Sequence, residues 1–491
     1  MSELSSLYPQ PLWQWFEQIC AIPHPSKHEH ALSAFIQRWA QQQGLALVVD
    51  TVGNLIIKKP ATAGYENRKT VVIQAHLDMV PQKNADKVHD FTQDPIEAYV
   101  DGDWVKAKGT TLGADNGIGM ASALAILASN DIPHGPLEVL LTVDEEAGMT
   151  GAFGLAAGLL DAEILINTDS EQQGEIYMGC AGGVDAEFTL PVTWQPSAAE
   201  TTAFALKMSG LKGGHSGVNI HLGRANANKL LARFLAGYGQ QLDVAVASFQ
   251  GGSLRNAIPR EATVTLTVPT AKVAAFESAV AEFSAILTAE YAIAEPNLLL
   301  STVAVDTIAQ VLTPATQHRL VHLLNACPNG VVRMSDDVVG VTETSLNVGV
   351  VTTTAESIQV LCLIRSLIDS GRAQVESTLS SLAELTQIPV RFSGAYPGWK
   401  PDPSSAVMAI VRETYTDIYQ NDPVIMVIHA GLECGLFKKP YPQMDMVSIG
   451  PTIRFPHSPD EMVQISTVGQ YWQLLTAVLA RIPVRADAAQ A

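Results

Sequence analysis

The chain has 491 residues, of which 47% are hydrophobic and 16% charged, and its formal net charge at neutral pH is −19. This length exceeds what a single hydrophobic core usually supports, so we expect more than one domain. The excess of acidic residues argues against nucleic acid or an anionic membrane as a partner, because both are polyanions.

The cysteines and the N-terminal segment predict a cytoplasmic protein. Five cysteines are scattered along the chain without a Cys-x-x-Cys pair. This pattern is typical of free thiols in a reducing cytosol rather than of a disulfide framework. The N-terminal segment lacks the basic start and apolar core of a signal peptide. No apolar run approaches the roughly 20 residues that a membrane span requires.

Strands and helices alternate over the first 183 residues. In chain order we expect a helix at 31–43, a hairpin at 45–59, a strand at 69–80, a helix at 117–129, a strand at 137–143, a helix at 151–158 and a strand at 163–168. This alternation predicts an α/β domain with a mostly parallel central sheet flanked by helices.

The pattern changes between residues 184 and 397. The expected elements there are amphipathic strands at 204–209, 262–268, 345–351 and 358–365 and a long helix at 225–237. They predict an α+β insert. The pattern leaves open whether two sub-units of similar order, strand, helix and strands, are stacked within it. After a proline-rich bend, a helix at 407–419, a strand at 446–450 and a helix at 466–480 return to the first pattern. We therefore predict one α/β domain in two parts, 1–183 and 398–491, interrupted by a lid at 184–397.

Acidic and histidine side chains follow the predicted strands of the α/β domain or begin its helices. These residues are His76, Asp78, Asp115, Glu145, Glu146, Asp169 and His457. Because ligands bind beyond the carboxyl ends of the strands in an open α/β sheet, we expect these side chains to meet in one crevice.

The charge of this group favours two metal ions. Three carboxylates (Asp115, Glu146 and Asp169), two dications and one bridging hydroxide sum to zero charge, which a partly buried site tolerates. Two neutral imidazoles, of His76 and His457, complete the ligand set. Imidazole with carboxylate and without thiolate suits Zn, Mn or Co at a catalytic site.

Two acids remain beside these ligands. Asp78 lies two residues after His76, so on a strand it points to the same side and can accept the other imidazole N–H. Glu145 precedes Glu146 and faces elsewhere, which favours a role as general base. Each motif alone also has a structural interpretation, such as a surface turn, a solvated loop or, for Asp115, a helix cap. Their shared position in the fold favours a metal centre.

Two other segments resemble sites but favour a structural role. The stretch PHPSKHEH at 23–30 is rich in histidine, yet Ser26 and Glu29 fit a capping box that opens the next helix. Cys434 in HAGLECG has no assured partner for a nucleophilic role, so we expect it to be structural.

The motifs HLDMVP, TLGADNGIGMA, TVDEEAGMTGA, INTDSE, GGHSG and GPTIRFPHSPDE span essentially the whole chain. Together they resemble the co-catalytic dinuclear zinc exopeptidases, a family of dipeptidases, aminoacylases and carboxypeptidases. Within it they are most similar to the bacterial aminoacyl-histidine (Xaa-His) dipeptidases. The resemblance implies a zinc-exopeptidase catalytic domain with an α/β fold, interrupted by an α+β lid that also forms a dimer.

The resemblance also implies how the site residues divide. His76 and Asp169 would bind one zinc ion, Glu146 and His457 the other, and Asp115 would bridge them. A cis peptide bond is implied after Asp115. Aspartate at position 169 is implied to favour a peptidase over a deacylase.

For the lid, the resemblance implies a set of substrate-binding residues. His215 would stabilise the oxyanion, either in its own subunit or across a dimer interface. Asn256 and Arg365 would bind the substrate carboxylate, Arg365 through a bidentate fork. A surface salt bridge is the alternative for Arg365. His429 and Glu433 are candidates for lining the pocket.

The implied function is a metallo-dipeptidase of broad specificity that includes Xaa-His dipeptides such as carnosine. Hydrolysis would proceed by attack of a zinc-bridging hydroxide, with Glu145 as general base and Asp78 orienting His76. The resemblance implies two Zn²⁺ per subunit, with Co²⁺ or Mn²⁺ as substitutes, and a homodimer through the lid. Alternatives are an N-acyl amino acid deacylase or a tripeptidase on the same scaffold. A non-catalytic peptide-binding protein would require a missing ligand or base, and none is missing.

Overall fold

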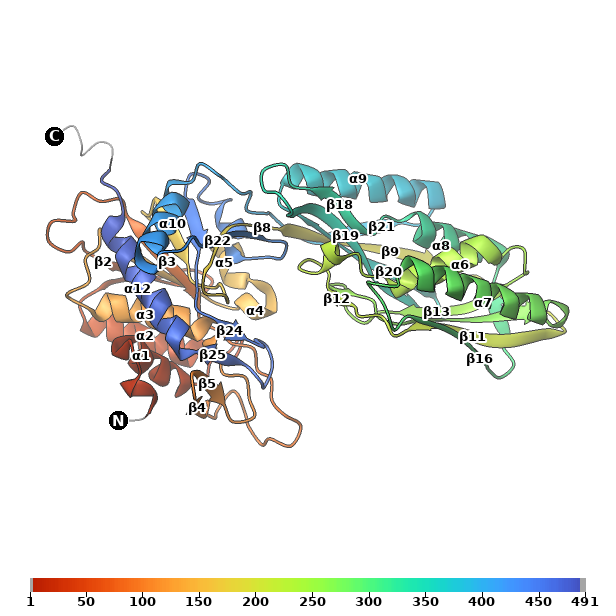
Figure 1. Ribbon diagram of the computed structural model, residues 1–491, viewed down its shortest axis with the longest axis horizontal. Coiled ribbons are helices and arrows are strands. Elements are labelled where there is room, and N and C mark those ends of the chain that lie inside the picture. The colour runs from red at the N-terminus through yellow and green to blue at the C-terminus, as the bar shows by residue number, and fades with distance from the viewer. Residues whose placement is uncertain (1–2, 486–491) are drawn as a thin grey trace. The chain divides into compact units, whose positions relative to one another are not determined.

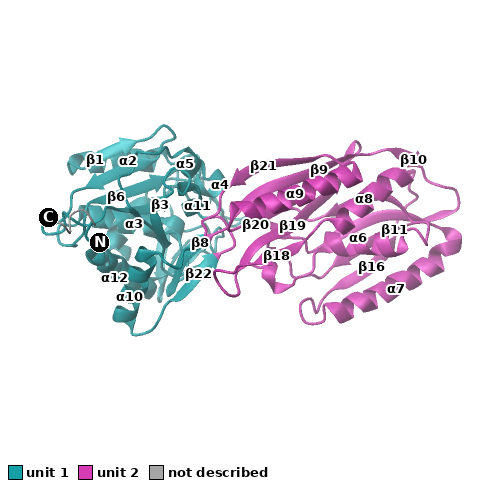
Figure 2. Ribbon diagram, turned by 90° about the horizontal axis from the view of Figure 1, so that it is seen from above, with its two compact units in different colours: residues 1–179, 401–427, 432–491 teal, residues 180–400, 428–431 magenta. Residues whose placement is uncertain are grey.

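The computed structural model describes residues 3–485, which form two compact units (Figure 2). Unit 1 contains the chain up to Gly179, Pro401–Val427 and the chain from Leu432 onward, and unit 2 contains Cys180–Lys400 and Ile428–Gly431. The chain therefore leaves unit 1 four residues before the domain boundary expected at 183/184. The functional boundaries at 183/184 and 397/398 remain predictions.

Unit 1 has an α/β architecture (Figure 1). Its helices are η1 (Leu4–Ser6), α1 (Gln10–Cys20), α2 (His30–Gln42), α3 (Ala114–Ala128), α4 (Glu145–Gly148), α5 (Thr150–Gly154), α10 (Ala406–Tyr419), α11 (Glu433–Phe437) and α12 (Ile465–Arg481). Its strands are β1 (Ala46–Val49), β2 (Leu55–Lys59), β3 (Val71–His76), β4 (Ala98–Asp101), β5 (Trp104–Ala107), β6 (Leu137–Thr142), β7 (Ile164–Asn167), β8 (Glu175–Cys180), β22 (Val424–Ile428), β23 (Asp445–Ser448), β24 (Ile453–Arg454) and β25 (Met462–Gln464).

The main sheet of unit 1 has the order β1-β2-β6-β3-β7-β23-β8-β22 among the described residues. The four middle strands β6, β3, β7 and β23 are parallel to their neighbours in that series, whereas β1, β2 and β8 pair in antiparallel fashion. A second, antiparallel sheet has the order β24-β25-β5-β4. The α/β fold with a parallel centre, interrupted by an inserted region, is thus confirmed.

Alternation along the central strands fixes which side chains meet the helices. Val71, Ile73 and Ala75 of β3 belong to one hydrophobic core with buried residues of α1, α2, α3, α10 and α12. Because successive strand residues point to opposite faces, Gln74 and His76 lie on the other face of the sheet. All six residues of β3 are buried, as expected for a central strand between two covered faces.

Unit 2 is an α+β structure. Its strands are β9 (Gly182–Pro191), β10 (Trp194–Pro196), β11 (Thr201–Ser209), β12 (Gly214–His215), β13 (Ala245–Gly251), β14 (Ala257–Ile258), β15 (Ala262–Pro269), β16 (Leu299–Ala304), β17 (Gln310–Leu312), β18 (Gly330–Met334), β19 (Thr342–Thr353), β20 (Ser357–Ser366) and β21 (Val390–Tyr396). Its helices are η2 (Ile220–Leu222), α6 (Ala227–Tyr238), η3 (Thr270–Lys272), α7 (Val273–Glu290), α8 (Pro314–Ala326) and α9 (Asp369–Thr386).

One continuous antiparallel sheet organises unit 2, with the order β16-β11-β15-β13-β19-β20-β9-β21 and β18 beside β19. The two sub-units of similar order that the sequence left open lie side by side in this one sheet. Each runs strand, helix, two strands, helix, strand, and their strand orders, β16-β11-β15-β13 and β21-β9-β20-β19, are equivalent. Alternate residues of β20, such as Cys362 and Ile364, share a core with α6, α7, α8 and α9, so these helices cover one face of the sheet (Figure 1). Arg365 of β20 and its register partner Ser345 of β19 lie on the opposite face.

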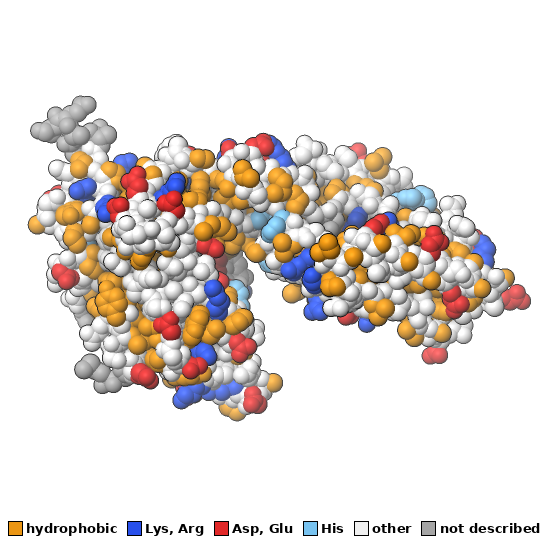
Figure 3. Space-filling view, in the orientation of Figure 1, with side chains coloured by type: hydrophobic (Ala, Val, Ile, Leu, Met, Phe, Trp, Pro, Cys, Tyr) orange, Lys and Arg blue, Asp and Glu red, His pale blue; other side chains and the backbone are white. Residues whose placement is uncertain are grey.

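The visible surface and the helices bear on the sequence-based expectations of charge and of membrane span. On the face shown in Figure 3, acidic and basic side chains are interspersed with hydrophobic and neutral ones. Within residues 3–485, none of the helices combines the length and apolar character needed to cross a bilayer.

Candidate metal centre

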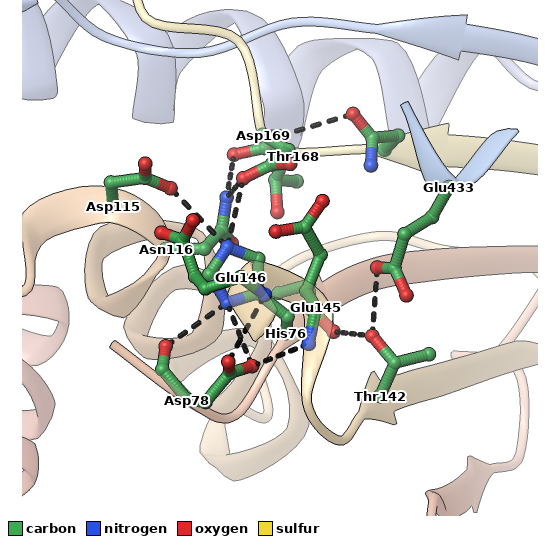
Figure 4. Close-up of polar contacts among 12 residues, drawn as sticks. His76, Asp78, Asp115, Asn116, Thr142, Glu145, Glu146, Thr168, Asp169 and Glu433 are labelled. Atoms are coloured by element: carbon green, nitrogen blue, oxygen red, sulfur yellow. Dashed lines mark hydrogen bonds and ion pairs between the residues drawn. The ribbon is translucent and has the colours of Figure 1, made fainter. Parts of the chain in front are cut away.

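The candidate site lies at the carboxyl ends of the central parallel strands of unit 1 (Figure 4). His76 is the last residue of β3, Glu145 and Glu146 begin the short helix α4 after β6, and Asp169 follows β7 by two residues. Because β6, β3 and β7 are parallel neighbours, these ends meet at one edge of the sheet. Asp115, near the start of α3, also reaches this edge.

The side chains form two groups that share Asp115. In one group, His76 Nε2 lies 3.2 Å from Asp115 Oδ1 and 3.3 Å from Asp169 Oδ1. In the other, His457 Nε2 lies 3.2 Å from Asp115 Oδ2 and 3.1 Å from Glu146 Oε2. Within each group the candidate ligand atoms all lie within 4.8 Å of one another. Asp115 therefore offers one carboxylate oxygen to each group.

The donor set fits divalent metal ions. It consists of imidazole nitrogen and carboxylate oxygen, the ligands that zinc, cobalt and manganese accept at catalytic sites. The His76 side chain is only 1% exposed, whereas that of His457 is 53% exposed, so the site opens on the His457 side. Glu146 Oε1 is buried without a hydrogen-bond partner among the described residues. A bound cation would satisfy this oxygen.

Without a cation, protons on the histidines offset the negative charge of the acids. Hydrogen bonds with Asp115 and Glu146 raise the pKa of His457 to about 11. Burial disfavours a charged His76, but Asp169 and Asp115 hold its pKa well above the usual value. Burial also opposes ionisation of Asp115, yet hydrogen bonds with both histidines keep its pKa well below the usual range. The acids thus favour positive charge at this site, and divalent cations could supply it.

Asp78 connects His76 to the turn that carries the paired glutamates. His76 Nδ1 lies 3.0 Å from the backbone oxygen of Asp78 and 3.4 Å from its Oδ1. The same carboxylate accepts the backbone N–H of Glu145 at 2.9 Å and of Glu146 at 3.1 Å. Although burial opposes it, the hydrogen bond with His76 lowers the pKa of Asp78 to about 2. This contact leaves Nε2 of His76 as the nitrogen that faces the other acids.

The residues expected to form a capping box instead support this turn. Ser26 Oγ donates to Asp78 Oδ2 at 2.8 Å, and Glu29 Oε1 accepts the N–H of Lys27 and of Asp144, each at 3.0 Å. Glu29 is the N-cap of α2 but makes no side-chain cap. The capping-box prediction was wrong because Ser26 is not the N-cap of α2, which begins at His30, and because Ser26 and Glu29 bind Asp78 and Asp144, far away in sequence.

Glu145, the residue proposed as the general base, is the first residue of α4. Burial raises its pKa well above the usual value, and the charges of Asp169 and Glu146 add to the shift. The cluster of candidate ligand atoms that contains His76 and Glu146 also includes Glu145. Figure 4 shows its side chain between Asp169 and Glu433.

Glu433 lies beneath the centre rather than in unit 2 with His429. Its Oε2 accepts Gln74 Nε2 at 2.6 Å and Thr142 Oγ1 at 2.8 Å. Gln74 Oε1 in turn accepts Asn167 Nδ2 at 2.5 Å. These buried polar residues lie two to three positions before the candidate site residues at the ends of β3, β6 and β7, so they link the three strands below the candidate metal centre. Polar residues within otherwise apolar strands were the feature of the sequence that could have indicated this network.

Two further residues missed by the sequence reasoning fix the segment that carries Asp115. The Asp115–Asn116 peptide bond is cis, as the resemblance implied. Asn116 Nδ2 donates to the backbone oxygen of Thr168 at 3.0 Å and also to Asp169 Oδ1. Glu461 accepts backbone N–H groups of the same segment.

In unit 2, His215 and Arg365 lie side by side. His215 Nδ1 accepts the backbone N–H of Gly217 at 3.2 Å and of Val218 at 3.0 Å, so in the neutral ring the proton is on Nε2. Arg365 Nη2 lies 3.3 Å from that Nε2. Because both groups are then donors, they are arranged to share an oxygen acceptor. Burial, together with Arg365, lowers the pKa of His215 to about 4.

Arg365 is not a surface residue, so the surface salt bridge considered for it is wrong. Its guanidinium is buried and donates to Tyr396 Oη at 3.2 Å. His429 Nε2 lies 2.8 Å from Ser345 Oγ, and Ser345 is the register partner of Arg365. Asn256 is exposed, and its backbone oxygen accepts the N–H of Ser216 at 2.8 Å. Among His215, Arg365, His429 and Asn256, only Asn256 is exposed.

Comparison with known proteins extends these observations to the whole chain. A sequence model of "Peptidase family M20/M25/M40" matches residues 72–481. The chain is 60% identical over 487 residues to the cytosol non-specific dipeptidase of Escherichia coli (strain K12), which covers 99% of this chain and 100% of that protein. It is 61% identical to the crystal structure of aminoacylhistidine dipeptidase from Vibrio alginolyticus, with a TM-score of 0.92 and 99% of each chain covered.

A more distant structure shares the fold. Aminopeptidase PepT from Bacillus cereus is 16% identical, with a TM-score of 0.56 and coverage of 97% of this chain and 99% of that one. The match of the family model over most of the chain, together with the full-length relatives, leads to one assignment. The chain belongs to peptidase family M20/M25/M40.

Proposed function

We propose that this protein is a metallo-dipeptidase of broad specificity that hydrolyses dipeptides, Xaa-His dipeptides such as carnosine among them. The observation that carries the proposal is the division of the Asp115 carboxylate between two groups, each with one histidine and one further acid. The full-length relatives named as dipeptidases support the substrate class.

In the proposed centre, His76, Asp115 and Asp169 hold one ion and Asp115, Glu146 and His457 hold the other. The expected ions are two Zn²⁺ per subunit, with Co²⁺ or Mn²⁺ as substitutes. When bound, the ions supply a Lewis acid for the scissile carbonyl and lower the pKa of a water molecule.

The protein's own residues then move the proton and hold the substrate. Asp78 fixes the tautomer and orientation of His76. Glu145 takes a proton from the attacking water and gives it to the leaving amine, a role that its raised pKa supports. His215 donates its Nε2–H to the developing oxyanion, and Arg365 and Asn256 bind the substrate carboxylate. His429 orders the same pocket through Ser345.

We also propose a cytoplasmic homodimer that assembles through the lid at 184–397. The name of the Escherichia coli relative, which places that protein in the cytosol, supports the location. Analytical ultracentrifugation of the full chain tests the dimer, and a monomer at micromolar concentration would contradict it.

The activity is tested with purified protein reconstituted with Zn²⁺. The substrates are β-alanyl-histidine, a set of neutral dipeptides, a tripeptide and an N-acetyl amino acid. We expect hydrolysis of the dipeptides and its loss after treatment with a chelator. Hydrolysis confined to the N-acetyl amino acid or to the tripeptide would instead establish a deacylase or a tripeptidase.

A further inference from the structure

The Glu461 carboxylate binds a run of consecutive backbone N–H groups. Its Oε2 accepts the N–H of Leu112 at 2.8 Å and of Gly113 at 3.0 Å, and its Oε1 accepts those of Ala114 at 2.8 Å and of Asp115 at 3.2 Å. The residue is 2% exposed. A buried carboxylate is costly unless donors surround it, so these bonds make the position of Glu461 and the shape of the turn interdependent.

The bound turn ends at the residue that both halves of the metal centre share. Leu112–Asp115 leads into α3, where the first N–H groups of a helix have no partner within the helix. Gly113 in this turn has a positive φ of 72°, and a Cβ at this position would lie 3.0 Å from Met79 Sδ. Glu461, which binds the backbone N–H of Asp115, is 346 residues away from it in sequence.

Glu461 also belongs to the turn that carries His457. This turn joins β24 to β25, and within it Glu461 N donates to Ser458 O at 3.0 Å and Ser458 Oγ donates to Phe455 O at 2.9 Å. His457 itself has a positive φ of 59°. One tightly bonded turn thus provides a metal-ligand candidate and, four residues later, the clamp on Asp115. The 3.2 Å contact between His457 Nε2 and Asp115 Oδ2 is set by both.

We propose that Glu461 is a positioning residue that fixes Asp115 relative to His457 and thereby sets the affinity of the centre for divalent cations. The inference rests on the proposed metal centre and deepens it. Glu461 touches neither substrate nor metal in this account, because its oxygens are occupied by backbone N–H groups. Replacing a partner that orients a metal ligand commonly weakens metal binding about 10- to 100-fold, and we expect Glu461→Gln to fall in this range. Its amide N–H₂ would face two backbone donors.

Glu138 provides a matched control within unit 1. It is also 2% exposed and clamps backbone, accepting the N–H of Asp161 at 3.1 Å and of Ala162 at 3.0 Å. It lies near the start of β6, whereas the metal centre is beyond the end of that strand. Glu138 also forms an ion pair with Lys58, so Glu138→Gln likewise removes a buried charge from its partners.

The experiment measures zinc affinity by competition with a chromophoric chelator, the visible spectrum of the Co²⁺-loaded protein, and urea unfolding of the metal-free protein. We expect both variants to be destabilised, and only Glu461→Gln to lose zinc affinity and to change the cobalt spectrum. Amide hydrogen exchange at residues 112–115 should accelerate in Glu461→Gln alone. If Glu461→Gln does not fold, Glu461→Asp, which keeps the charge but shortens the reach, is measured in its place.

The outcomes separate this inference from the proposed function. The positioning role alone would be overturned if the unmodified protein binds two ions and Glu461→Gln or Glu461→Asp binds them equally tightly with the same cobalt spectrum. An equal loss of affinity in Glu138→Gln would also overturn it, because the effect would then be one of general stability. Unmodified protein that binds no metal would overturn both proposals.

Discussion

Replacing Glu145 with glutamine should separate chemistry from metal binding. The side chain keeps its size and loses its capacity as a base. The turn should keep its shape, because Asp78 binds the backbone N–H of Glu145 at 2.9 Å and of Glu146 at 3.1 Å, and neither bond involves the replaced group. The 3.1 Å contact between Glu146 and His457 is likewise untouched. We therefore expect an unchanged metal content.

The expected loss of turnover follows from the base that is removed. General base catalysis typically contributes about 10²- to 10⁴-fold, which corresponds to roughly 2.7–5.5 kcal/mol of the barrier. The pKa of Glu145 is raised by burial and by the neighbouring acids Asp169 and Glu146. An acid whose pKa is raised in the folded protein lowers the stability of the fold as the pH rises from its unfolded-state pKa to its folded-state pKa. The metal-free variant should thus gain stability relative to the unmodified protein as the pH rises above 4.5, the ordinary pKa of a glutamic acid.

The assay combines kcat for a dipeptide with elemental analysis of bound zinc. Glu146→Gln serves as the control, because removal of a ligand should lower zinc content as well as kcat. Glu145→Gln with full kcat would refute the assignment of the base. Glu145→Gln that loses zinc as Glu146→Gln does would show that Glu145 is a ligand instead.

Three further predictions concern the ionisation and packing of named residues. Asp115 raises the pKa of His457 to about 11. The protonated His457 should therefore stabilise the metal-free fold fully below about pH 6.5, and this stabilisation should be lost as the pH rises through 11. In urea unfolding with chelator present, His457→Gln should therefore lower the free energy of unfolding most at low pH. A decrease in this free energy that does not vary with pH would contradict the prediction. His215 should titrate near pH 4 by NMR, and a midpoint near 6.5 would indicate an exposed ring. Gly119→Ala places a methyl group 2.9 Å from the backbone oxygen of Thr168, so we expect the free energy of unfolding to fall by about 1–3 kcal/mol. A rise in the free energy of unfolding, as expected for alanine at an uncrowded helical position, would contradict this crowding.

Much of the site could be predicted because its residues share a position in a regular fold. His76, Glu146 and Asp169 follow three apolar strands, and once those strands are parallel their ends must meet. The strand pattern itself is visible in the period and β-branching of segments such as β3. The roles assigned to these residues stay predictions until the variants are measured.

The supporting contacts could not be predicted, because they depend on pairs far apart in the chain. Ser26 and Glu29 match a local capping motif, yet their partners Asp78 and Asp144 are 52 and 115 residues away. Glu461 likewise has no nearby feature that distinguishes a clamp from a solvated loop acid. Local spacing reports on helices and strands, whereas such carboxylates are assigned only once the turns they bind are placed in three dimensions.

The place of β23 in the sheet has a consequence for biosynthesis. This strand (Asp445–Ser448) lies between β7 and β8, although both of those were made more than 260 residues earlier. A ribosome-bound chain therefore exposes an open sheet edge beside β7 until late in translation. If His457 and Glu461 act as proposed, the metal centre also cannot be completed before this last part of the chain has emerged.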